Sequence, residues 1–258
     1  MNAQRFLYGI WLVRPQRRET PAVIGQKFLD TLDALSVADP FFTPWKVLDS
    51  SAMAALPLAT ARQRIASIVE NNVVRNDSDQ PEPQSGYSTI ALTDNPITSR
   101  IVNLTVRAGA VAPGSNVMLA VGDPYLAPTD PAIVSYPRFR QALLAMSALW
   151  QPAWSYACAF RMDYWKTPIV SGAPVIRYNP FHITWIAYLS PKVATGLVVP
   201  PAEVRTEHAR GGGILLSATE EDFDTANPDH LRRAHLLAET MIAQTGDEPD
   251  DDNPGGSD

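Results

Sequence analysis

The order of the apolar segments constrains this chain more than any other feature of its sequence. Short strand-like runs come in groups, separated by helical segments, rather than alternating strictly with helices. Three such runs, at 86–92, 101–107 and 116–121, follow one another with no helical pattern between them. The middle run alternates apolar and polar residues, as a half-buried antiparallel strand does. Grouped strands are typical of α+β folds, so we expect a mostly antiparallel sheet with about four helices packed on one face.

Capping residues locate the helices. Thr20 can accept a hydrogen bond at a helix N-terminus, and Pro21 suits the first helical position because its missing N–H costs nothing there. Asn227 and Pro228 repeat this arrangement before the last apolar segment. Helices are expected to begin at residues 21, 60, 137 and 228. The remaining strands are expected to cover residues 6–13, 153–162, 181–189, 202–205 and 213–218.

Charge is distributed unevenly along the chain. The formal net charge is −6, but residues 246–258 contain six acids and no base, which leaves 21 acids against 21 Lys and Arg in the rest. A near-neutral body argues against binding to nucleic acid or to an acidic membrane. We expect one domain over 1–245, with 1–135 and 136–245 as candidate similar halves, and a disordered acidic tail over 246–258.

No catalytic or metal-binding motif stands out. Cys158 is the only cysteine, so it cannot form an internal disulfide, which fits a reducing compartment. A single cysteine also argues against a structural zinc site. His230 and His235 are five residues apart on an expected helix, so they diverge and are interpreted as surface positions. The glycines at 211–213 precede a strand rather than a helix, which favours a turn over a phosphate loop. We therefore predict no enzyme activity, no metal and no cofactor.

A group of carboxylates just before the last helix is the candidate interaction site. Such a group can be a solvated loop at the positive end of a helix. It can also meet a basic partner: nucleases need basic surfaces to hold phosphates, so a protein that blocks one can present carboxylates to the same groove. The candidate contacts are Glu220, Glu221, Asp222 and Asp224, with Asp94 and Tyr125 on other expected loops.

Several segments, spread over about residues 5–243, resemble the immunity protein 52 family. The first is Gly9-Ile10-Trp11, followed by Arg14 and Glu19. The others are Asp39-Pro40 with Phe42 and Trp45, Gly86-Tyr87-Ser88, Thr184-Trp185-Ile186-Ala187-Tyr188-Leu189-Ser190, Gly212-Gly213-Ile214-Leu215, and Asn227-Pro228-Asp229-His230.

The resemblance implies a function. The family is associated with polymorphic and type VI secretion toxins, often with nuclease domains of the restriction-endonuclease fold. It implies a non-enzymatic protein that binds its cognate toxin, encoded nearby, in the cytoplasm of the producing cell. Our leading hypothesis is that the protein neutralises the toxin by occluding its active groove. We expect no nucleic acid, membrane or small molecule as partner. Two alternatives stay open: a hydrolase that uses His182, and an adaptor that binds the toxin without inhibiting it.

Overall fold

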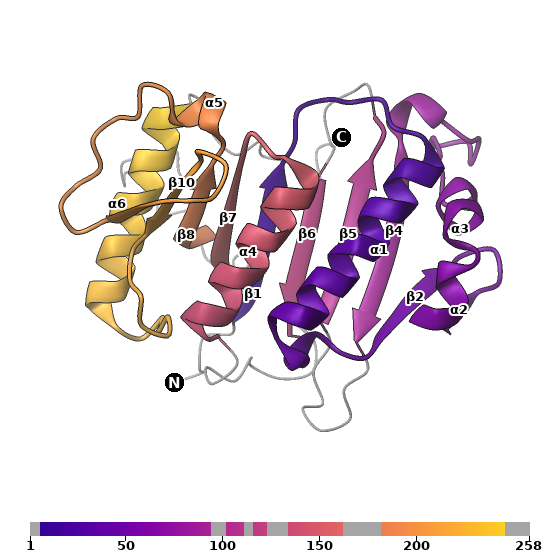
Figure 1. Cartoon of the computed structure of the whole chain (residues 1–258), viewed down its shortest axis with the longest axis horizontal. Helices are drawn as coiled ribbons and strands as arrows, with labels where there is room; N and C mark the ends of the chain where they lie inside the picture. The colour runs from indigo at the N-terminus through magenta and orange to yellow at the C-terminus, as the bar shows by residue number, and fades with distance from the viewer. Residues whose placement is uncertain (1–5, 94–101, 111–115, 123–133, 162–181, 246–258) are drawn as a thin grey trace.

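The strands of the described chain form one antiparallel sheet. The computed structural model describes residues 6–93, 102–110, 116–122, 134–161 and 182–245 (Figure 1). The strands are β1 (Phe6–Val13), β2 (Trp45–Asp49), β3 (Ala54–Pro57), β4 (Tyr87–Thr93), β5 (Val102–Ala108), β6 (Asn116–Val121), β7 (Trp154–Arg161), β8 (His182–Leu189), β9 (Arg205–His208) and β10 (Ile214–Ser217). Their order is β3-β2-β4-β5-β6-β1-β7-β8-β10-β9, with antiparallel neighbours throughout. The predicted α+β class and antiparallel sheet are confirmed.

Of the four predicted helix starts, the two with a predicted capping residue are confirmed by the hydrogen bonds of their caps. The Thr20 side chain accepts a hydrogen bond from the Val23 N–H at 3.4 Å, and the Asn227 side chain accepts one from the Asp229 N–H at 2.9 Å. The helices are α1 (Pro21–Ala38), α2 (Leu58–Arg62), α3 (Ile65–Asn71), α4 (Tyr136–Trp150), α5 (Pro191–Ala194) and α6 (Pro228–Thr245), with short 3-10 turns η1 (Pro40–Phe42) and η2 (Pro83–Ser85).

Strand β1 lies at the centre of the sheet, between β6 and β7. Its residues Tyr8, Ile10 and Leu12 are buried, as period-two alternation requires of a strand with one face on the core. Helices α1 and α4 lie side by side across that face (Figure 1). Their own buried stripes, which include Phe28 on α1 and Phe139 on α4, complete the core.

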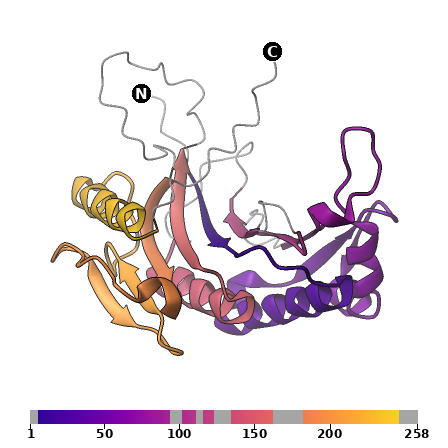
Figure 2. The same cartoon turned by 90° about the horizontal axis from the view of Figure 1, so that it is seen from above.

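Helix α6 departs from the expectation that the helices share one face. Figure 2 shows α6 on the side of β8 that faces away from α4. Residues 184–187 of β8 and 215–217 of β10 are buried consecutively rather than alternately. Because both faces of this part of the sheet are buried, each face needs a covering layer, and α6 supplies the second one.

Two other segments differ from the sequence prediction. The strand expected at 202–205 is β9, which starts only at Arg205, because the Val204 N–H bonds the Pro201 carbonyl in a turn at 2.9 Å. The helix expected from Thr60 is two helices, because Arg64 leaves the helical region, with φ −124° and ψ 6°.

Candidate functional site

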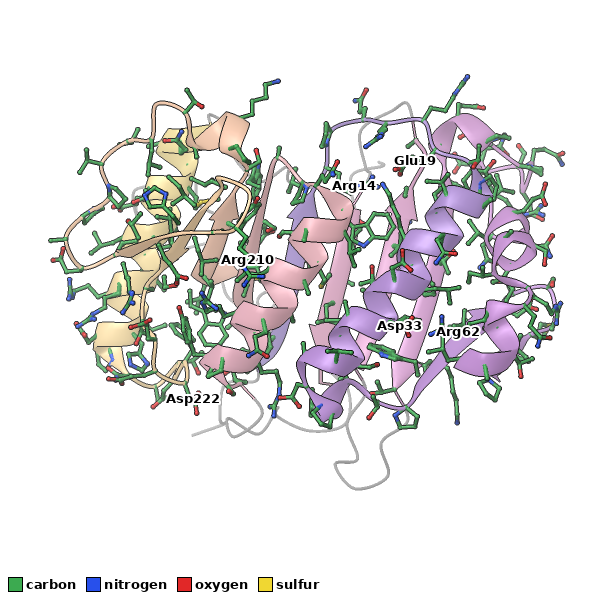
Figure 3. All side chains as sticks on the ribbon, viewed as in Figure 1. Arg14, Glu19, Asp33, Arg62, Arg210 and Asp222 are labelled. Atoms are coloured by element: carbon green, nitrogen blue, oxygen red, sulfur yellow. The ribbon has the colours of Figure 1, made fainter. Side chains whose placement is uncertain are left out.

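The loop that joins β10 to α6 carries the four predicted carboxylates, and an aromatic anchor fixes it to the core. Phe223 is 1% exposed, and its ring centroid lies 5.1 Å from that of Trp185 on β8. The Trp185 ring in turn lies 5.3 Å from Phe139 on α4. We call residues 219–227 the acidic loop; Asp222, at its middle, is at the lower end of the molecule in Figure 3.

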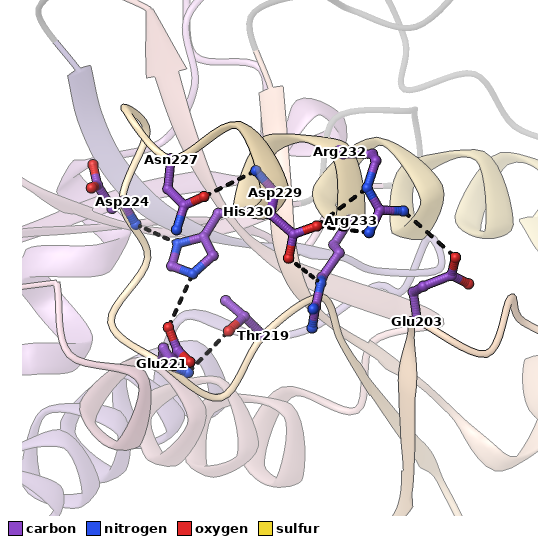
Figure 4. Close-up of polar contacts among 9 residues, drawn as sticks. All are labelled: Glu203, Thr219, Glu221, Asp224, Asn227, Asp229, His230, Arg232 and Arg233. Atoms are coloured by element: carbon purple, nitrogen blue, oxygen red, sulfur yellow. Dashed lines mark hydrogen bonds and ion pairs between the residues drawn. The ribbon is translucent and has the colours of Figure 1, made fainter.

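His230 binds the acidic loop from the first turn of α6. Its Nδ1 accepts a hydrogen bond from the Asp224 N–H at 3.1 Å, and its Nε2 lies 3.3 Å from a Glu221 carboxylate oxygen (Figure 4). The ring is buried and stacks on Phe223, with 5.7 Å between centroids. The interpretation of His230 as a surface residue is therefore wrong, because the loop folds back over the start of the helix. His235, one turn further along, is exposed as expected.

All four carboxylates lie on the acidic loop, and each has an intramolecular contact. Asp222 accepts a hydrogen bond from the Tyr136 N–H at 3.0 Å and so caps α4. Asp224 accepts one from the Ala226 N–H at 2.8 Å, and Glu220 forms an ion pair with Arg205 on β9. All four residues are nevertheless exposed, and the Glu221 side chain keeps 79% of its accessible surface.

The acidic loop carries uncompensated negative charge. Arg205 offsets Glu220, but within the described chain neither Asp222 nor Asp224 has a Lys or Arg within ion-pair distance. The charge of Asp224 reaches Tyr8 on β1: burial raises the pKa of that phenol, a hydrogen bond to Thr225 opposes the shift, and the Asp224 charge adds to it. The loop therefore presents a negative potential at its surface.

For the other candidate residues, Asp94, Tyr125 and His182, the structure describes at most the backbone. Asp94 and Tyr125 lie outside the described residues. His182 begins β8, opposite Phe160, and its side chain also lies outside what the structure describes. These three residues stay predictions.

The chemistry available elsewhere in the described chain is limited. Its His, Cys, Asp and Glu residues form no group of three or more that could hold a metal ion, and none of its helices is long and apolar enough to cross a membrane. Cys158 is fully buried, and burial raises the pKa of its thiol. Gly211 and Gly212 both have φ of +86° in the turn before β10, which confirms their expected role.

Arg14 and Glu19 form a second charged cluster, at the upper end of the molecule in Figure 3 and away from Asp222. They are buried and form an ion pair at 2.9 Å, and Lys27 of α1 donates to the same carboxylate at 2.6 Å. The Arg14 guanidinium lies 4.7 Å from the centre of the Trp150 ring at the end of α4. The cluster therefore ties β1, α1 and α4 together.

The pKa of Glu19 depends on these contacts. Burial alone would raise the pKa of this carboxyl group, because it disfavours the charged form. Hydrogen bonds and charges from Lys27 and Arg14 outweigh that effect and lower the pKa below its ordinary value. Glu19 is therefore held as a carboxylate inside the protein.

Comparison with known families identifies the family of this chain. The model of the family described as immunity protein 52 matches residues 7–246, from β1 through the end of α6. This chain belongs to the immunity protein 52 family. Both the Arg14–Glu19 cluster and the acidic loop lie inside the matched region, so they are parts of the immunity protein domain.

Comparison with solved structures supports the fold. The chain is similar to the Pseudomonas aeruginosa T6SS protein PA0821, with a TM-score of 0.51 and 10% sequence identity. The similarity covers 92% of this immunity protein and 72% of PA0821. At this identity the likeness concerns the fold alone. No curated protein sequence matches the chain.

Proposed function

We propose that this immunity protein binds and neutralises a cognate bacterial toxin. The observation that carries the proposal is the family match over residues 7–246, which runs from β1 through α6. The type VI secretion system named for PA0821 supports a toxin delivered by such a system. The protein then acts stoichiometrically, without catalysis, metal or cofactor, in the cytoplasm of the cell that makes the toxin.

Occlusion of a basic groove is the proposed mechanism, with a nuclease of the restriction-endonuclease fold as the toxin. A nuclease groove attracts phosphates, so carboxylates that enter it compete for the same cationic side chains. The exposed Glu221 carboxylate and the uncompensated Asp222 and Asp224 support this mechanism. Asp94 and Tyr125 remain proposed as further contacts.

Co-expression with the toxin encoded beside this gene tests the proposal. We expect cells that express the active toxin to survive only with the immunity protein, and the two proteins to purify together. Survival without a complex would contradict direct binding and favour enzymatic repair through His182. A complex without survival would identify an adaptor instead.

A further inference from the structure

An apolar surface lies at the C-terminal end of α1. Val37, in the last turn of α1, is 88% exposed, although valine is among the residues most often buried in folded proteins. Pro40 of η1, directly beyond it, is exposed, and Phe41 is half-buried. The chain therefore places three apolar side chains in solvent contact within five residues.

Contacts across the fold join this apolar surface to the acidic loop. Asp39 accepts a hydrogen bond from the Arg138 guanidinium at 2.7 Å, and that guanidinium lies 4.5 Å from the centre of the Phe41 ring. Two residues before Arg138, the Tyr136 N–H donates to Asp222. Pro137, between Tyr136 and Arg138 on α4, is exposed as well. We call the combined region the end surface; it consists of Val37, Pro40, Phe41, Pro137, Glu221, Asp222 and Asp224.

The end surface has a packed aromatic ring and a negative charge. Phe41 packs edge-on against the fully buried Phe42, with 5.4 Å between ring centroids, so its position is fixed before any partner binds. A fixed side chain loses less conformational entropy on binding. Asp39 neutralises Arg138, so the acids of the loop dominate the local charge.

We infer that the end surface is where the toxin docks, which deepens the proposed function and rests on it. An apolar centre bordered by charge is the usual anatomy of a protein interface. The negative charge of the end surface favours a basic partner. The side chains of Val37 and Phe41 favour a partner with an apolar depression beside its own basic groove. A second copy of this chain fits poorly, because the acidic loops of two copies would repel each other.

Calorimetric titration with the purified toxin domain encoded beside this gene, carrying an inactivating substitution, tests this inference. We expect Val37→Ala to weaken binding about 10-fold, because two methyl groups leave a buried contact. We expect Val37→Arg to weaken it at least about 100-fold, because the variant places a charge in that contact. The matched control is Val199→Arg: Val199 is 87% exposed on the loop between α5 and β9 and lies outside the end surface. Thermal unfolding of each variant establishes that it is folded.

The outcomes separate this inference from the proposed function. Loss of binding in Val37→Arg with unchanged binding in Val199→Arg supports the end surface. Wild-type affinity in Val37→Arg, or equal losses in both variants, overturns the assignment while leaving toxin binding intact. Failure of the wild-type protein to bind the toxin overturns the proposed function itself.

Discussion

Glu19 shows how single residues hold this fold together. Its carboxylate accepts hydrogen bonds from Arg14, next to β1, and from Lys27 on α1, while Arg14 also donates to the Trp150 carbonyl of α4 at 3.3 Å. Trp150 returns to α1 through a 2.8 Å hydrogen bond from its indole N–H to Thr31. One buried carboxylate thus organises a network across three elements, and its removal leaves a buried guanidinium without its counter-charge.

Glu19→Gln should therefore lower the free energy of unfolding by about 3 kcal/mol at pH 7. The pKa of Glu19 is lowered in the folded state, so its contribution is present above the ordinary glutamate pKa, about 4.3, and is lost as the pH falls through the folded value. Urea unfolding at pH 7 and in stepwise acidified buffers should show the difference from wild type shrinking with falling pH. Glu239→Gln, at an exposed position on α6, is the control. A difference that is constant with pH would contradict the assigned role.

At the scale of elements, the acidic loop has a structural role, the capping of α4, and a proposed interaction role in toxin binding. Different substitutions test the two roles. Asp222→Ala removes the cap of α4 and should cost about 1 kcal/mol of stability, whereas Asp222→Asn keeps a side-chain acceptor and should cost less. Chemical denaturation of the two variants measures this. Equal losses would mean that the charge, rather than the hydrogen bond, stabilises the helix start.

Replacing all four carboxylates by amides tests the interaction role of the same loop. Glu220→Gln, Glu221→Gln, Asp222→Asn and Asp224→Asn together should weaken toxin binding about 10-fold or more and flatten its dependence on salt, since charge pairing is lost. Glu70→Gln, Asp77→Asn and Glu239→Gln, at exposed positions outside the end surface, form the control. Unchanged affinity and salt dependence in the four-amide protein would remove the acidic loop from the interface.

Elements defined by local signals were predictable, and those defined by distant contacts were not. Strand β6 matches its predicted bounds, and α1 begins at its predicted cap, because alternation and capping act over a few residues. The face that α6 covers depends on how its loop closes over β8, and so does the burial of His230. The acidic residues are neighbours in sequence, so their cluster could be predicted. The end surface could not, because it depends on the contact between Asp39 and Arg138, which are 99 residues apart.

At the scale of the whole molecule, β1 joins the two candidate halves, 1–135 and 136–245, into one sheet. It belongs to residues 1–135 but pairs along its length with β7, which belongs to 136–245. Strand β1 pairs with β6 within residues 1–135, but without residues 136–245 its other edge is unpaired, and without β1 strand β7 loses its partner on that side. We therefore expect one cooperative unfolding transition, with the same urea midpoint by tryptophan fluorescence and by far-ultraviolet circular dichroism. Two separate midpoints would contradict a single domain over 1–245.

Immunity by direct binding is most directly tested by titrating the active toxin with the purified chain. Stoichiometric occlusion predicts that toxin activity falls in proportion to added immunity protein and vanishes near one equivalent per toxin molecule. Loss of activity far below one equivalent would instead indicate catalytic inactivation by this protein. Full toxin activity at a large excess of folded protein would contradict neutralisation of that toxin altogether.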